Sequence, residues 1–170
     1  MKKLVSTFVF AAFAALFTSS LALADVQSGI EAFKSAKFDI ALKELRPAAE
    51  NGDPNAMYYL GQMYAAGFGV KKDPAKALAY YREAAEMGYP PAQTEYGTAL
   101  AIGDGVKQDV EKGLKWLLIA ARTGDKSAKD YAEHFSRLMS RTVVLEATRD
   151  AIEWQHRFNK KNAAAEATPQ

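Results

Sequence analysis

The sequence predicts an all-α fold in which pairs of helices stack as a solenoid, and three observations lead to this prediction. One pattern occurs twice in register: the stretch from Ala56 to Val70 is followed 36 residues later by the stretch from Ala92 to Val106. Apolar residues within each copy recur with helical spacing. Glycine, aspartate and proline mark the junctions between the segments. A fixed period of this length indicates units that bury their apolar faces against their neighbours.

Each copy predicts two helices, called A and B below. The A helices are expected at 55–66 and 91–102, and the B helices at 74–87 and 110–123. The Gly-x-Gly-Val segments between them lack the Lys-Ser or Lys-Thr of a phosphate-binding loop and the strand that would precede it. They therefore predict tight turns with glycine at positive φ, from which Val70 and Val106 return to the core.

Aspartate and glycine define the predicted helix ends. Asp53, Asp73, Asp109 and Asp125 stand where an N-cap carboxylate is expected, two of them directly before a proline. The end of each B helix is marked by a glycine suited to a left-handed C-terminal residue. Gly61 and Gly97 lie inside the A helices, where glycine costs about 1 kcal/mol, so we expect a neighbouring B helix to approach closely there.

The two ends of the repeat region are irregular. Helices are expected at 26–35 and 38–50, and Pro47 predicts a kink in the second of these. The third copy begins after Asp125 but then loses its glycines. Ser140 is expected to cap a last helix whose apolar stripe faces the stack and whose other face is polar, as a terminal cap requires. That stripe consists of Val144, Ala147, Ala151, Trp154 and Phe158.

The predicted organisation has three parts: a signal peptide at 1–24, a repeat domain at 25–160 and a disordered tail at 161–170. The repeat domain divides into a partial unit at 26–54, repeats at 55–90 and 91–126, and an incomplete unit with its capping helix at 127–160.

The N-terminal segment predicts secretion. Lys2 and Lys3 precede an apolar run, and Ala22 and Ala24 form an Ala-x-Ala site, so cleavage after Ala24 would place the protein in the periplasm or outside the cell. An uncleaved membrane anchor is the alternative.

Cleavage removes two basic residues and leaves 20 basic and 20 acidic ones, a balance that argues against a nucleic-acid partner. The chain has no cysteine, which excludes disulfides and thiolate metal sites.

The matched residues resemble the Sel-one-like (Sel1-like) repeat, a relative of the tetratricopeptide repeat. The resemblance lies in Leu60-Gly61-x-x-Tyr64-x-x-Gly67-x-Gly69-Val70-x-x-Asp73, together with Ala77, Ala84, Ala85 and Gly88, and with partial units it extends from about Asp25 to Phe158. It implies a right-handed superhelix of antiparallel helix pairs. It also implies a protein that holds other proteins together without catalysis of its own.

No constellation in the sequence predicts catalysis, a metal or a cofactor. The only imidazoles are His134 and His156, and no His-Glu-x-x-His motif is present. Ser136 and His134 are two residues apart on one helix and point to different faces. Asp104 and Asp109 could be imagined as an acid pair for glycan hydrolysis, but a loop and a helix cap explain them more simply.

Binding of a protein or peptide partner is the favoured function. The tetratricopeptide resemblance implies a concave wall of A-helix residues that face away from the core, with the tyrosines supplying contact area. Either tyrosine could instead pack on Phe33 or Phe38 of the preceding unit, Tyr59 more readily than Tyr58. Tyr58→Ala is expected to weaken binding with little loss of stability. The rival interpretations are an envelope- or cell-wall-acting enzyme and a membrane-tethered adaptor; the partner's identity and the oligomeric state are not predicted. The candidate partner-binding residues are Asn55, Tyr58, Tyr59, Gln62, Thr94, Thr98, Asp130, His134 and Arg137.

Overall fold

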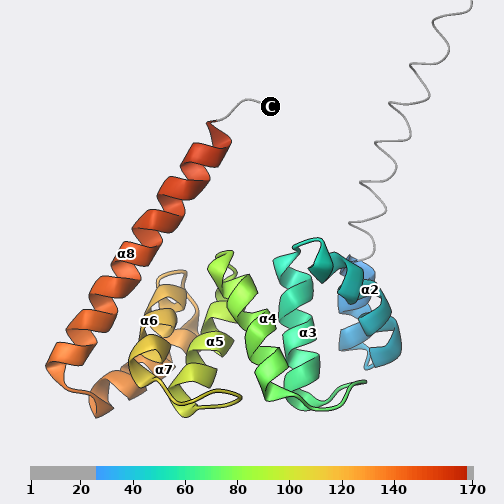
Figure 1. Ribbon diagram of the computed structural model, residues 1–170, viewed down its shortest axis with the longest axis horizontal. Helices are drawn as coiled ribbons and strands as arrows, with labels where there is room; N and C mark the ends of the chain where they lie inside the picture. The colour runs from blue at the N-terminus through green and yellow to red at the C-terminus, as the bar shows by residue number, and fades with distance from the viewer. Residues whose placement is uncertain (1–25, 168–170) are drawn as a thin grey trace, which may run out of the picture.

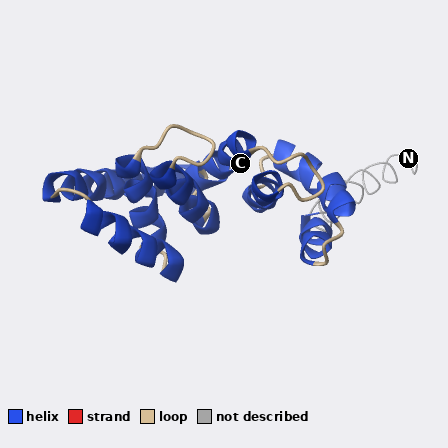
Figure 2. Cartoon of the chain, turned by 90° about the horizontal axis from the view of Figure 1, so that it is seen from below, coloured by secondary structure: helices blue, strands red, loops and turns tan. Residues whose placement is uncertain are grey.

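The computed structural model describes residues 26–167, which consist of helices and loops without a strand (Figure 2). The expected signal peptide lies outside these residues. A first helix covers residues 26–34. It is followed by α2 (Phe38–Glu50), α3 (Pro54–Ala66), α4 (Pro74–Glu86), α5 (Pro90–Ile102), α6 (Val110–Ala121), α7 (Lys126–Leu138) and α8 (Arg141–Glu166). The all-α prediction is confirmed, and the helices up to α6 start and end within two residues of the expected positions.

The helices pack with their neighbours in chain order, as a solenoid requires. Helix α3 packs against α4 and α5 against α6 within the repeats, while α2 against α3, α4 against α5 and α6 against α7 join successive units. Figure 1 shows α2 to α7 side by side, with α8 rising away from the last unit and contacting α6. Helices α2 to α7 therefore contact mainly their neighbours along the chain, and the A helices α3, α5 and α7 occur in every second place.

Side chains cap the helices where the sequence predicts. Asp53, Asp73, Asp109 and Asp125 each accept a hydrogen bond from the backbone N–H three residues later, at 2.8–3.0 Å. Tyr89, which replaces the aspartate before α5, makes no such bond. Each cap satisfies a backbone donor that the helix itself leaves unpaired, which contributes about 1 kcal/mol.

The two glycines inside the A helices permit the expected close approach of the B helices. A side chain at Gly61 would collide with the ring of Tyr81 on α4. One at Gly97 would lie 2.9 Å from the backbone oxygen of Gly113 on α6. The propensity cost of glycine is thus offset by packing of the paired helices.

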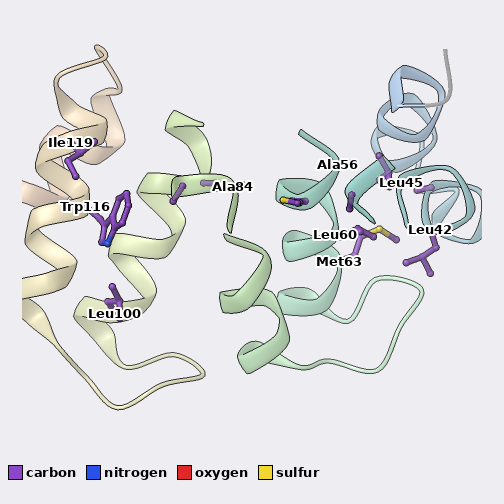
Figure 3. Packing of buried hydrophobic residues seen from close by; sticks show 14 of the residues in the cluster. Leu42, Leu45, Ala56, Leu60, Met63, Ala84, Leu100, Trp116 and Ile119 are labelled. Carbon is purple, nitrogen blue, oxygen red and sulfur yellow. The ribbon is translucent and has the colours of Figure 1, made fainter. Parts of the chain in front are cut away.

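The core follows the line of helix pairs. Figure 3 shows Leu42 and Leu45 of α2 facing Leu60 and Met63 of α3 at one end, with Trp116 and Ile119 of α6 towards the other. These residues belong to one buried cluster, and a second cluster joins α5 and α6 to α7 and α8. Small residues such as Ala56 and Ala84 are fully buried between the helices and allow the backbones to come close.

The expectation for the two loop valines is half correct. Val70 is half-buried and packs against the core, because its loop lies on Phe38 and Leu42 of the preceding unit. Val106 is 38% exposed, and the loop that contains it lies on the backbone of Pro74 instead. The second loop therefore meets no large apolar surface into which Val106 could insert. Pro47 lies inside α2, which is one continuous helix from Phe38 to Glu50.

The last helix caps the stack as expected but is longer. The Ser140 side chain accepts a hydrogen bond from the Val143 N–H, and Ala147 and Ala151 are buried. Helix α8 then continues to Glu166, whereas the sequence suggested a disordered tail from 161. Alanine has the highest helix propensity, and a helix already nucleated extends easily into the alanine-rich segment 162–166 even though these residues bury little.

Candidate functional site

A depression of about 410 Å³ lies where the first helix, α3, α4 and α5 meet. We call it the aromatic groove and define it by its lining residues: Phe33, Gln62, Ala65, Ala66, Phe68, Tyr81 and Glu95. Four of the seven come from α3 and the loop that follows it. The groove therefore lies on the A-helix wall, where the resemblance implied partner binding.

Aromatic rings form one side of the groove. The Phe68 ring stacks on that of Phe38 with centroids 4.8 Å apart, and it lies 6.2 Å from the ring of Phe33. Phe68 nevertheless remains 41% exposed. The loop between α3 and α4 therefore places a rigid apolar surface at the edge of the groove, held by contacts to the preceding unit.

Tyr58 and Tyr59 belong to the same aromatic network. Tyr59 packs edge-on against Phe33 at 5.1 Å, as one of the alternatives from the sequence proposed. Tyr58 contacts the rings of Tyr59, Tyr81 and Tyr89. Both tyrosines are half-buried. Removal of the Tyr58 ring would therefore cost stability, contrary to the expectation from sequence.

The Tyr58 hydroxyl is hydrogen-bonded and difficult to ionise. The Gln62 side-chain N–H donates to the Tyr58 oxygen at 2.8 Å. Burial, with the nearby charge of Glu95 as the second cause, raises the pKa of Tyr58 to about 12. Burial and then Glu95 also raise the pKa of Tyr81 well above its usual value. Both hydroxyls therefore stay protonated at physiological pH.

Glu95 is the only carboxylate that lines the groove. Burial raises the pKa of Glu95 above that of a free side chain, and repulsion by Asp125 adds to the shift. Within residues 26–167, no hydrogen bond or ion pair of the Glu95 side chain is found. The groove thus combines apolar rings with a half-buried negative charge that the fold does not neutralise.

The predicted site residues of the second repeat have structural roles. Thr94 is only 7% exposed, and its single hydroxyl proton is shared between the Asp125 carboxylate at 3.2 Å and the Pro90 carbonyl at 3.3 Å. Thr98 donates to the Thr94 carbonyl at 2.8 Å. A partner would not reach the Thr94 hydroxyl directly. This residue ties α5 to the start of α7 instead.

The other predicted residues are only partly brought together. Gln62 lines the groove, Tyr58 and Tyr59 support it, and Asn55 is half-buried on the first turns of α3. Asp130 and His134 are exposed on α7. Arg137 forms an ion pair with Glu133 at 3.4 Å, and both line a different depression between α6 and α7. The structure thus separates Arg137 from the aromatic groove.

Four lining residues with aromatic or charged side chains were not among the candidates from sequence: Phe33, Phe68, Tyr81 and Glu95. Two of them had a signal. Phe68 is an aromatic residue in a turn whose second copy has Asp104, and Glu95 is a charge at the position where the first repeat has Tyr59 and the third has Tyr131. A change of residue type between equivalent positions of the repeats, at a position outside the core, can therefore indicate a binding residue.

A second depression, of about 540 Å³, lies at the loop between α3 and α4 and is rich in lysine. There the Lys76 ammonium lies 4.2 Å from the centre of the Tyr64 ring. A side-chain hydrogen bond with Lys76 lowers the pKa of Tyr64. This lysine therefore already has a partner within the chain.

Among residues 26–167, no group of three or more histidine, aspartate or glutamate residues lies close enough to hold a metal ion. In the same part of the chain, no helix has the length and hydropathy needed to span a bilayer.

These features define a class of protein: a solenoid of helix pairs with a groove on its A-helix wall. Residues 54–89 and 90–125 match the family model described as the Sel1 repeat. The chain is also similar to a solved Sel1 repeat protein from Oxalobacter formigenes, with 32% identity over 74% of this chain and 97% of that one, and a TM-score of 0.62. The chain belongs to the Sel1 repeat family.

The fold is shared with a longer protein. The solved structure of c5321, a protective antigen present in uropathogenic Escherichia coli strains and displaying an SLR fold, is 22% identical over 88% of this chain, with a TM-score of 0.77. This chain spans about a third of that protein's length (33%). No curated protein matches the sequence. Proteins with Sel1 repeats generally act as scaffolds for protein–protein interaction.

Proposed function

We propose that this chain is a non-catalytic scaffold that binds a segment of a partner protein in the aromatic groove. The observation that carries the proposal is the pairing of exposed Phe68 with the uncompensated Glu95 in one depression. An apolar pocket with a few polar groups suits recognition of a side chain. Aromatic residues in such pockets contribute a large share of binding energy at interfaces.

The proposed location is the periplasm or the extracellular space. Support comes from the sequence alone: Lys2 and Lys3, the apolar run after them, and the Ala-x-Ala site ending at Ala24. A scaffold in that compartment would bind an envelope component and regulate it. Equal numbers of acidic and basic residues after cleavage support a protein partner over a nucleic acid.

An enzyme acting on cell-wall or other envelope material is the alternative function. Such an enzyme would need carboxylates or imidazoles that converge in one cleft. The lining of the aromatic groove has one carboxylate, Glu95, and no imidazole. His134 and His156 are exposed on α7 and α8. The groove therefore supports binding better than hydrolysis.

Affinity capture with two matched variants tests the proposal. Ala66 is exposed and lines the groove, so Ala66→Arg would fill it with a long side chain. Ala79 is exposed on the B helix α4, and Ala79→Arg adds the same charge away from the groove. Each protein would be crosslinked in intact envelope and its captured proteins identified. We expect Ala66→Arg to lose a partner that the parent protein and Ala79→Arg both retain.

Capture of the same proteins by the parent protein and by both variants would refute groove binding.

The proposed location has a separate test, which is the N-terminal sequence of the protein isolated from cells. A start at Asp25 supports cleavage and release. A start at Met1 would instead favour the membrane-tethered adaptor.

A further inference from the structure

We propose that the aromatic groove accepts an arginine side chain of the partner, with Glu95 as its counter-ion. The inference rests on the proposed function and specifies the chemistry that the groove recognises. It depends on three features of the groove: the isolated carboxylate, the apolar rings beside it, and the hydrogen-bonding character of the remaining polar lining.

The first feature is that the Glu95 carboxylate has no hydrogen-bond or ion-pair partner among residues 26–167. The capping aspartates accept backbone hydrogen bonds, and Glu133 pairs with Arg137, whereas the Glu95 side chain has neither kind of partner among the residues described. The corresponding positions of the first and third units hold Tyr59 and Tyr131, so packing of the repeat does not demand a carboxylate there. Its presence in a half-buried position without a partner among the described residues points to a ligand.

The second feature is the free-energy cost of holding the charged Glu95 carboxylate in a partly buried position. Burial raises its pKa, and Asp125 adds repulsion instead of compensation. A buried carboxylate without a partner destabilises the folded protein. A cation of the partner that enters the groove would remove this penalty. Relief of the destabilisation of the free protein would therefore contribute to the free energy of binding.

The third feature is the combination of aromatic rings with a second hydrogen-bond acceptor beside Glu95. One N–H of the Gln62 side-chain amide donates to Tyr58, and the Gln62 carbonyl oxygen is a second acceptor in the lining. Phe33, Phe68 and Tyr81 provide rings. A guanidinium group has five donors in one plane and stacks on aromatic faces. Lysine has a more strongly hydrated charge and fits this combination of rings and acceptors less well.

Exposed apolar residues at the positions equivalent to Ala66 in the next two units suggest what lies beside the arginine. Ala66 lines the groove, and its counterparts in the next two units are Ile102 and Leu138, which are 58% and 69% exposed. These side chains continue the A-helix wall with apolar surface. We therefore expect apolar residues next to the arginine in the partner.

A peptide titration tests the inference without knowledge of the partner. The peptide Ac-Leu-Arg-Leu-NH2 would be titrated into the full-length purified protein and followed by amide NMR. Its citrulline counterpart has the same shape without the charge, and its lysine counterpart has a charge without the guanidinium plane. We expect shifts at Gln62, Phe68 and Glu95, and a Kd for the arginine peptide about 10-fold below those of both counterparts.

Variants assign the effect to Glu95. Glu95→Gln should bring the arginine peptide to the affinity of the citrulline peptide, whereas Glu83→Gln on the exposed face of α4 should leave all three affinities unchanged. Carbon-detected NMR provides a second readout, because a bound cation should lower the pKa of the Glu95 carboxyl. A merely structural role of Glu95 would not produce that change.

Several outcomes would overturn the inference. These are equal binding of the arginine and citrulline peptides, equal binding of the lysine peptide, or no binding of any peptide at millimolar concentration. The failure is distinguishable from failure of the proposed function. If capture of the envelope partner is lost in Ala66→Arg but unchanged in Glu95→Gln, the groove binds a partner but does not recognise an arginine side chain.

Discussion

The ring of Phe158 on α8 lies directly against Gly88 in the turn between α4 and α5. The same ring stacks on Trp154, with centroids 4.9 Å apart, and Trp154 in turn packs against Trp116 of α6. The capping helix therefore closes the last repeat and also reaches the junction between the two complete repeats. This contact links the C-terminal helix to the unit that carries the aromatic groove.

Gly88→Ala should destabilise the protein more than Gly52→Ala does. Both glycines end a B helix, with φ of +85° and +88°, so an added Cβ is strained at both. Only Gly88 has Phe158 within contact distance, while nothing lies within 4 Å of the position at Gly52. We expect urea unfolding to show an additional loss of about 1–2 kcal/mol at Gly88.

The double variant isolates the contact. In a Phe158→Ala background, Gly88→Ala should cost no more than Gly52→Ala, because the obstructing ring has gone. If the additional cost persists without Phe158, the contact between α8 and the turn is not its cause.

Asp125→Ala should cost about 1–2 kcal/mol of unfolding free energy, more than Asp73→Ala. Asp125 caps α7 through the Ala128 N–H at 2.8 Å and also accepts the Thr94 hydroxyl at 3.2 Å. Asp73 caps α4 and has no such second bond. In a Thr94→Val background the difference between the two substitutions should shrink. Equal costs in both backgrounds would show that the link between α5 and α7 contributes nothing.

Tyr58→Ala should lower the unfolding free energy by about 2–4 kcal/mol, because it removes a ring that packs on three others. Tyr58→Phe keeps the ring, loses the bond from Gln62, and should cost about 1 kcal/mol. Chemical denaturation measures both. A negligible effect of Tyr58→Ala would restore the sequence-based view that this residue serves binding alone.

Tyr58 also predicts an alkaline loss of stability. Its pKa is about 12 in the folded protein and near 10.0 when unfolded. The unfolded chain therefore loses its proton first, and the stabilisation present below pH 10.0 is lost as the pH rises towards about 12. The fall in melting temperature between these pH values should be smaller in Tyr58→Phe than in the parent protein. An identical fall would assign it to other groups.

Glu95→Gln should raise the melting temperature at neutral pH. Burial raises the folded pKa of Glu95, so the folded state binds its proton more tightly than the unfolded state does. The associated stability is present in acid and lost as the pH rises through the folded pKa. Glutamine avoids the charge, and the difference between variant and parent should therefore disappear in acid. A variant less stable than the parent at neutral pH would reveal a structural role for Glu95.

The fold was predictable because its determinants are local and occur twice. The 36-residue register, the capping aspartates and the glycines of the turns each act within a few residues of their position, so the sequence shows them directly. Val106 was misjudged because its burial depends on the surface beneath its loop, which belongs to the preceding unit. The end of α8 was misjudged because burial was weighed above the helix propensity of alanine.

The groove was only partly predictable, for a different reason. Gln62 could be assigned to it from helical spacing, since it lies on the face of α3 opposite the core. Glu95, Phe68 and Phe33 come from three other segments, and which of them meet depends on the angle between successive units. Spacing within one helix does not fix that angle. For the same reason Arg137, assigned to the wall by register, lies in a different depression.

Site-specific photo-crosslinking in intact cells is the most direct test of the claim that the aromatic groove holds the partner. A photoreactive phenylalanine derivative would replace Gln62, which lines the groove, or Arg82, which is exposed on α4. The groove account predicts a discrete crosslinked protein from position 62 that position 82 does not give. Crosslinking of the same partner from position 82 but not from position 62 would contradict it.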